Sequence, residues 1–111
     1  MAERKIDIDR VFHALGDPTR RAILDHLVEG PTSVSNLAAP LGITLTAVAQ
    51  HLQVLESCRL ARTEKVGRVR TCRIEPAGFD ALEQWVRMHR TAWEAALDRL
   101  SEMLAEDEEG H

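Results

Sequence analysis

The 111-residue sequence predicts a single domain, residues 1–111, that is mainly α-helical and carries one small β-hairpin. Three observations predict this fold class. Apolar residues recur at spacings of three and four over most of the chain, Gly and Pro interrupt that spacing at a few places, and the period falls to two only after Leu60. The composition agrees, because 44% hydrophobic and 29% charged residues are typical of a chain that buries a core. We therefore expect five helices and one hairpin.

The first two helices are predicted on either side of Gly16. Residues 1–5 are polar and are expected to be frayed, and a short helix is predicted at residues 7–15. Asp17 is expected to cap the second helix, and Pro18 suits its first position because an amide hydrogen is not needed there. Gly30 and Pro31 should end this helix. The face that we expect it to bury comprises Ile23, Leu24, Leu27 and Val28.

A helix, a tight turn and a second helix are predicted within residues 33–57. Ser33 is expected to cap the first of the pair, and Pro40 limits its length before the turn at Gly42. Thr44 is expected to cap the second. The predicted core-facing positions of the second helix are Leu45, Val48, Leu52 and Leu55. Its opposite face is polar and is expected to meet solvent.

A basic hairpin is predicted at residues 60–74. If Gly67 and Arg68 form a two-residue loop, Gly67 supplies the positive φ of the turn and Lys65 lies opposite Arg70. Residues 59–73 contain six basic residues and one acidic residue, a local charge of +5, although the whole chain carries −4. The tip is therefore expected to be basic and exposed. The pairs expected further down are Ala61 with Ile74 and Thr63 with Cys72.

The last helix is predicted to begin at Pro76 and to run to residue 105, followed by an acidic tail at residues 106–111 that is expected to be disordered. Its apolar residues form two stripes, which is more than a body of this size can cover, and an exposed stripe usually marks a protein interface. We therefore expect a homodimer built on the helices at 7–15 and 76–105. The expected interface residues are Val11, Phe12, Trp85, Val86, His89, Trp93, Leu97 and Leu100.

The order helix, turn, helix and hairpin is that of a winged helix-turn-helix, which reads duplex DNA. The expected DNA-binding residues are Thr44, Thr46, Ala47, Gln50, His51 and Gln53 on the second helix of the pair, and Lys65, Arg68 and Arg70 on the hairpin. Gln50 can pair with adenine, Thr46 can bond to any base, and Ala47 can touch a thymine methyl group. His51 is expected either to hold a phosphate or to satisfy a local carbonyl group. Because residues 31–56 contain no Lys or Arg, phosphate neutralisation must come from the hairpin.

Several short motifs follow one another over about two thirds of the chain. They are Phe12-His13-Ala14-Leu15-Gly16-Asp17-Pro18-Thr19-Arg20, Ile23-Leu24, Ala47-Val48-Ala49-Gln50-His51-Leu52, Val54-Leu55 and Gly67-Arg68. In these motifs the chain resembles the ArsR family of winged-helix repressors, and the last helix, with Trp85 and Trp93, resembles the dimerisation helix of that family. The resemblance implies a homodimer that binds a palindromic operator in double-stranded DNA and leaves it when a signal changes. Metal-sensing members carry Cys-Val-Cys where this chain has Ser33-Val34-Ser35, so no metal and no other cofactor is expected.

Other classes of function fit the sequence less well. An aromatic content of 4%, without Tyr, supplies few stacking residues for RNA. No apolar run approaches the ~18 residues that cross a bilayer, and two cysteines without a signal peptide favour a cytoplasmic protein with reduced thiols. No nucleophile with a suitably spaced base is present, so neither catalytic residues nor an enzyme is expected.

Two alternatives stay open. The chain could be a winged-helix module that contacts proteins without binding DNA, since the reading helix is uncharged and the whole chain is acidic. It could instead be a thiol-based, redox-responsive regulator, since Arg59 and Arg73 neighbour Cys58 and Cys72 and could stabilise their thiolates.

Overall fold

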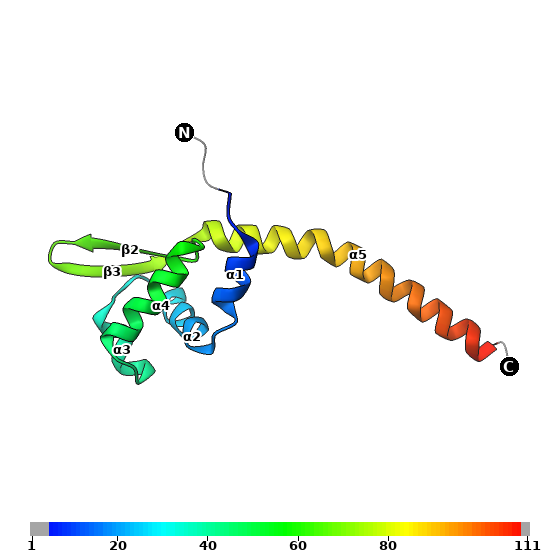
Figure 1. Ribbon diagram of the computed structural model, residues 1–111, viewed down its shortest axis with the longest axis horizontal. Coiled ribbons are helices and arrows are strands. Elements are labelled where there is room, and N and C mark those ends of the chain that lie inside the picture. Colours follow the sequence, from blue (N-terminus) through cyan, green and yellow to red (C-terminus); the bar gives the residue numbers. More distant parts are fainter. Residues whose placement is uncertain (1–4, 110–111) are drawn as a thin grey trace.

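The computed structural model describes residues 5–109, which form five helices and three strands. They are α1 (Ile8–Leu15), α2 (Pro18–Val28), β1 (Thr32–Ser33), α3 (Ser35–Leu41), α4 (Leu45–Ser57), β2 (Ala61–Val66), β3 (Val69–Ile74) and α5 (Pro76–Glu109). The first four helices and the strands form a body from which α5 projects (Figure 1). The predicted fold class is confirmed. Residues 1–4 of the predicted frayed end and residues 110–111 of the predicted tail lie outside the described residues.

Side-chain caps start α1 and α2. Asp7 Oδ1 accepts a hydrogen bond from the amide of Asp9 at 3.0 Å, and Asp17 Oδ2 accepts one from the amide of Arg20 at 2.9 Å. Such caps satisfy amides that the first turn of a helix leaves without partners. Pro18 occupies the first position of α2, so the predicted start of this helix is confirmed.

Two arginines of α2 close the end of α1. Arg20 Nε donates to the carbonyl of Ala14 at 2.8 Å, and its Nη2 donates to that of His13 at 3.2 Å. Arg21 Nη1 donates to the carbonyl of Leu15 at 2.7 Å. The His13 carbonyl also accepts a hydrogen bond from the Gly16 amide at 3.2 Å, and the arginines add partners at the end of α1, where carbonyls lack them, and fix α1 against α2.

The helix α3 begins at Ser35, two residues later than predicted. Thr32 and Ser33 form β1, which pairs with β3 through Thr32 and Cys72, so the backbone at Ser33 is extended. Ser33 Oγ nevertheless accepts a hydrogen bond from the amide of Asn36 at 3.2 Å. The serine therefore acts as a cap from within a strand that the sequence pattern did not reveal.

The hairpin has the predicted register. Lys65 pairs with Arg70 across the tip, and Gly67 has a φ of 64°, as the two-residue loop requires. The pairs at the base, Ala61 with Ile74 and Thr63 with Cys72, are also as predicted. In the sheet β3 lies between β1 and β2, so β1 ties one edge of the hairpin to the body and, within residues 5–109, β2 forms the other edge without a further strand.

The core lies between α1, α2, α3, α4 and the base of the hairpin. Its buried residues are Val11, Ala14, Ile23, Leu24, Leu27, Val34, Leu37, Val48, Leu52, Leu55, Cys58, Leu60, Ala61 and Cys72. Two residues predicted to face it do not. Val28 is 75% exposed and Leu45 is 52% exposed. Val28 is the last residue of α2 and Leu45 the first of α4, so both lie at helix ends away from the core.

The helix α5 runs for 34 residues from Pro76, as predicted, but continues beyond residue 105. Residues 106–109 of the predicted acidic tail are helical, which corrects the expectation of disorder there. Ala, Leu, Met and Glu predominate at this end and favour helix. No Gly or Pro interrupts the chain between Gly78 and Gly110.

Much of α5 has no partner within its own protomer. The described side chains from residue 90 to residue 108 are all exposed. The radius of gyration is 19.9 Å and the longest extent is 73 Å, whereas a compact chain of this length has a radius of about 13 Å. Across residues 5–109 no single helix is long and apolar enough to cross a membrane; α3 and α4 reach that measure only when taken together, and they meet at 108°.

Candidate nucleic-acid interface

The reading helix α4 presents a polar face to solvent. Thr44, Thr46, Gln50 and Gln53 are exposed, whereas Ala47 is partly buried. Thr44 Oγ1 accepts a hydrogen bond from the amide of Ala47 at 3.0 Å. The Thr44 hydroxyl thus caps α4 as predicted. The side chains free to reach base edges are therefore Thr46, Gln50 and Gln53.

The tip of the hairpin carries unpaired positive charge. Lys65, Arg68 and Arg70 are exposed, and within the described part of the chain none has a carboxylate oxygen within 4.0 Å. Two of the arginines nearer the base differ. Arg73 lies 3.9 Å from Glu64, and Arg59 Nη2 lies 3.3 Å from Glu75 Oε1. The charge available to an anionic partner is concentrated at the tip.

A groove of about 390 Å³ joins the hairpin to the reading helix. Its lining combines two arginines and one serine with four apolar residues, namely Arg68, Arg70, Ser35, Val34, Leu45, Ala49 and Val69. Leu45 and Val69 are each about half exposed. The predicted site residues did not include these apolar positions, and the early, wrong assignment of Leu45 to the core explains why. The groove therefore places apolar side chains beside the guanidinium groups of Arg68 and Arg70.

Glu56 links the reading helix to the hairpin. Its Oε1 accepts hydrogen bonds from both the amide and the hydroxyl of Thr63 on β2. A carboxylate that accepts two donors is held more firmly than one at a free surface. The contact fixes the angle between α4 and the hairpin. Nothing in the sequence pattern identified Glu56, because its partner lies on another element.

His51 lies on the flank of α4 that faces α2. Its Nδ1 atom is 3.4 Å from Arg20 Nη1 and 3.9 Å from Asp17 Oδ2. The neighbour of this nitrogen is a guanidinium group and not a backbone carbonyl, and the role of His51 in DNA binding stays a prediction. The backbone hydrogen bond from Arg20 lowers the pKa of Asp17, and the positive charge of Arg20 acts in the same direction. Asp17 is therefore an anion beside both residues.

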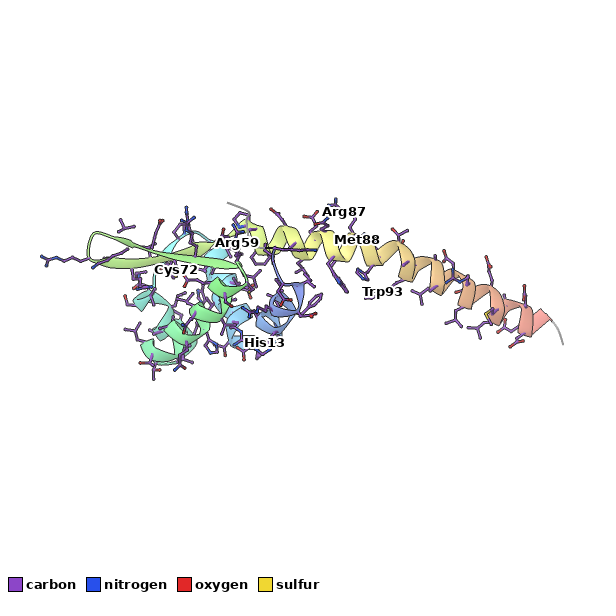
Figure 2. The ribbon with its side chains drawn as sticks, turned by 45° about the horizontal axis from the view of Figure 1, so that its top comes forward. His13, Arg59, Cys72, Arg87, Met88 and Trp93 are labelled. Atoms are coloured by element: carbon purple, nitrogen blue, oxygen red, sulfur yellow. The ribbon has the colours of Figure 1, made fainter. Side chains whose placement is uncertain are left out.

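An aromatic cluster joins α1 to α5. The Phe12 ring meets Trp85 edge-on with centroids 4.8 Å apart, and Trp85 stacks on His89 at 4.0 Å. Trp93 continues the cluster at 5.6 Å from Trp85. Trp93 and Arg87 lie on different sides of α5 (Figure 2). One side of α5 is therefore apolar and aromatic beyond the point where α1 covers it.

Most of the expected interface residues are exposed to a partner. Phe12, Val86, Trp93, Leu97 and Leu100 are between 39% and 60% exposed. Met88, Met103 and Leu104 are exposed to a similar degree and enlarge the apolar surface of α5. Val11 is different. It is 0% exposed and packs in the core of its own protomer, so it is withdrawn from the interface.

The two cysteines are buried and not disulfide-bonded. Burial raises the pKa of Cys58 above its ordinary value and raises that of Cys72 to about 11. The Cys72 Sγ atom donates a weak hydrogen bond to the carbonyl of Thr32 at 3.4 Å. The neighbouring arginines therefore do not produce reactive thiolates, which disfavours the redox alternative. Within residues 5–109, no three His, Cys, Asp or Glu side chains converge as metal ligands.

Comparisons with known proteins agree with this arrangement. A family model described as a helix-turn-helix domain matches residues 15–64. The chain is 43% identical over 74 residues to the HTH-type transcriptional regulator Rv2034 of Mycobacterium tuberculosis, which covers 67% of this chain and 69% of that protein.

Solved structures match over most of the chain. The crystal structure of the ArsR family transcriptional regulator RHA00566 has a TM-score of 0.73 and 44% identity, covering 85% of this chain and 97% of that one. A homodimeric winged helix-turn-helix DNA-binding domain, Mb0332 of Mycobacterium bovis, has a TM-score of 0.61 and 31% identity, covering 80% of this chain and 81% of that one. From fold, motifs and relatives together, the chain belongs to the ArsR family of winged helix-turn-helix transcriptional regulators.

Proposed function

We propose that the chain acts as a homodimeric repressor that binds a palindromic operator in double-stranded DNA. The observation that carries this proposal is the pairing of an uncharged, polar reading helix with a hairpin tip of three unpaired cations. The helix supplies side chains for base edges and the tip supplies charge for phosphates. Because such a regulator must reach the DNA that it binds, we propose that it acts in the cytoplasm.

The groove between α4 and the hairpin fits one strand of the DNA backbone. With α4 in the major groove and the hairpin tip at the adjacent minor groove, the strand between the two grooves would pass along this surface. Arg68 and Arg70 would take its phosphates, while Leu45 and Val69 would contact the apolar edges of deoxyribose. The exposed apolar residues of the lining, Leu45 and Val69, support duplex DNA as the ligand.

The homodimer follows from the unpartnered face of α5. Phe12, Trp93, Leu97 and Leu100 expose more contiguous apolar surface than a monomer usually leaves in water. A two-fold axis through α5 would present two reading helices to successive major grooves, about 34 Å apart. Because the two-fold axis relates the two reading helices, the two half-sites must be related in the same way, and the site is palindromic.

A binding-site selection from random duplexes, followed by fluorescence anisotropy over a salt series, tests the proposal. We expect one inverted repeat to be enriched and its affinity to fall steeply with salt, because each neutralised phosphate adds about 0.9 to the slope. Retention of all duplexes alike would contradict sequence-specific binding. Retention of none would favour the protein-contact module instead.

A further inference from the structure

The tautomer of His51 is set by its neighbour on α2. A guanidinium group has five N–H donors, no acceptor, and stays protonated in proteins. Arg20 Nη1 lies 3.4 Å from His51 Nδ1, nearer than the acceptor Asp17 Oδ2 at 3.9 Å, so the geometry favours a lone pair on the nitrogen that faces Arg20. A neutral imidazole with an accepting Nδ1 carries its hydrogen on Nε2. The free donor of His51 is therefore Nε2–H.

Arg20 is itself held from three sides. Its Nε and Nη2 atoms donate to the carbonyls of Ala14 and His13 at the end of α1, at 2.8 and 3.2 Å. Its own amide donates to Asp17 Oδ2 at 2.9 Å. With two of its guanidinium nitrogens bound to fixed carbonyls, the third cannot turn away from His51. The ring of His51 is thus oriented by the last turn of α1 and the first turn of α2.

The Nε2 nitrogen of His51 is a donor of a kind that α4 does not otherwise supply. The His51 side chain is 24% exposed, and residues 31–56 contain no Lys or Arg. The positive charge of Arg20 offsets the negative charge of Asp17 at this flank of the helix, so the Asp17 carboxylate does not leave the flank anionic. A phosphate oxygen accepts hydrogen bonds and donates none, so it matches an N–H donor held beside a cation.

We propose that His51 donates its Nε2–H to a phosphate of the DNA, that Arg20 is a positioning residue that selects this tautomer and this ring orientation, and that Asp17 acts through Arg20 by holding its amide. The inference rests on the proposed function and deepens it. His51 becomes a backbone contact of the reading helix, and α1, which also contacts α5 through Phe12 and Trp85, becomes part of the support for that contact.

The tautomer can be measured without any variant. Nitrogen-15 NMR of the histidine rings in the free protein at pH 8 should show His51 with its hydrogen on Nε2. A ring with the hydrogen on Nδ1 would overturn the proposal. In Arg20→Lys the single fixed tautomer should give way to a mixture. Arg21→Lys is the matched control, because Arg21 also closes α1, at Leu15, but does not contact His51.

The contact is tested by replacing the phosphates of a selected duplex, one at a time, with neutral methylphosphonate. At one phosphate in each half-site, replacement should weaken the wild-type protein about tenfold and leave His51→Asn unaffected. His51→Gln should keep most of the affinity, since the Gln amide nitrogen can stand near the position of Nε2, whereas the shorter Asn cannot reach it. Equal losses in His51→Gln and His51→Asn, or no phosphate coupled to residue 51, would overturn the contact. A protein that retains no duplex at all would instead refute the proposed function, and the contact with it.

Discussion

Replacing Gly78 with alanine should disturb the joint between α5 and the body. A Cβ atom at this position would lie 2.6 Å from the carbonyl oxygens of both Cys58 and Arg59. Both obstacles are backbone atoms, and Arg59 is held in a left-handed conformation with a φ of 61°. To reach ordinary van der Waals contact at 3.4 Å the start of α5 must move by about 0.8 Å, which also stretches the 2.8 Å hydrogen bond from the Gly78 amide to the Arg59 carbonyl.

The expected cost of Gly78→Ala is about 2 kcal/mol. Overpacking of this kind costs about 1–3 kcal/mol and a weakened hydrogen bond about 1 kcal/mol. Alanine returns about 1 kcal/mol through its higher helix propensity. The control is Gly16→Ala, where the nearest atoms are 3.4 Å from the new Cβ and φ is −71°, so its stability should be unchanged or slightly raised.

Urea unfolding at one fixed protein concentration measures both variants, since the stability of a dimer depends on concentration. Gly78→Ala should also weaken operator binding more than it weakens binding to a single half-site, because α5 sets the spacing of the reading helices. If Gly78→Ala and Gly16→Ala unfold at the same urea concentration, the close approach of α5 to Arg59 is refuted.

Three further outcomes are expected. Gln50→Ala should lose about 1–3 kcal/mol of binding free energy on the selected site and little on random duplex, whereas Arg68→Ala should weaken binding to both duplexes alike and flatten the salt slope. Anisotropy that shows the same pattern for both variants would contradict the division of roles between helix and hairpin. Leu97→Asp should give monomers in sedimentation and weaken operator binding, while Ala95→Asp, which adds the same charge on the opposite side of α5, should stay dimeric; two dimeric variants would exclude this face as the interface. Cys72 should react with iodoacetamide at pH 8 only after unfolding, and prompt labelling of the native protein would refute the burial of this thiol. Because its folded pKa of about 11 lies above the ordinary 9.0, the unfolded state loses its proton first, and the free energy of unfolding should fall as the pH rises from 9 to 11.

Local patterns were sufficient for the elements that depend on neighbouring residues. The Gly67 loop determines the register of the hairpin, because a two-residue turn leaves one pairing for Lys65 and Arg70. Asp17 and Pro18 mark the start of α2 for a similar reason: cap and first turn are contiguous in sequence. The fold class and the direction of each helix followed from such signals.

The errors and omissions concern contacts between distant elements. Periodicity places Val28 and Leu45 on apolar faces, but whether another element covers a helix end depends on packing that periodicity does not contain. Val11 belongs to the same apolar face as Phe12, and only the position of α2 and α4 decides that one is core and the other exposed. Arg20, Glu56 and β1 were missed as contacts because their partners lie at least seven residues away or on other elements.

The placement of the aromatic cluster has an optical consequence. The chain contains two Trp residues and no Tyr, and both indoles, Trp85 and Trp93, lie on α5 beside His89. Near-ultraviolet emission from this protein therefore originates from one helix, remote in sequence from the reading helix. A change in emission reports rearrangement along α5. Events confined to α4 or the hairpin leave this Trp emission unchanged. One fluorescence measurement can therefore distinguish dimer assembly from DNA recognition.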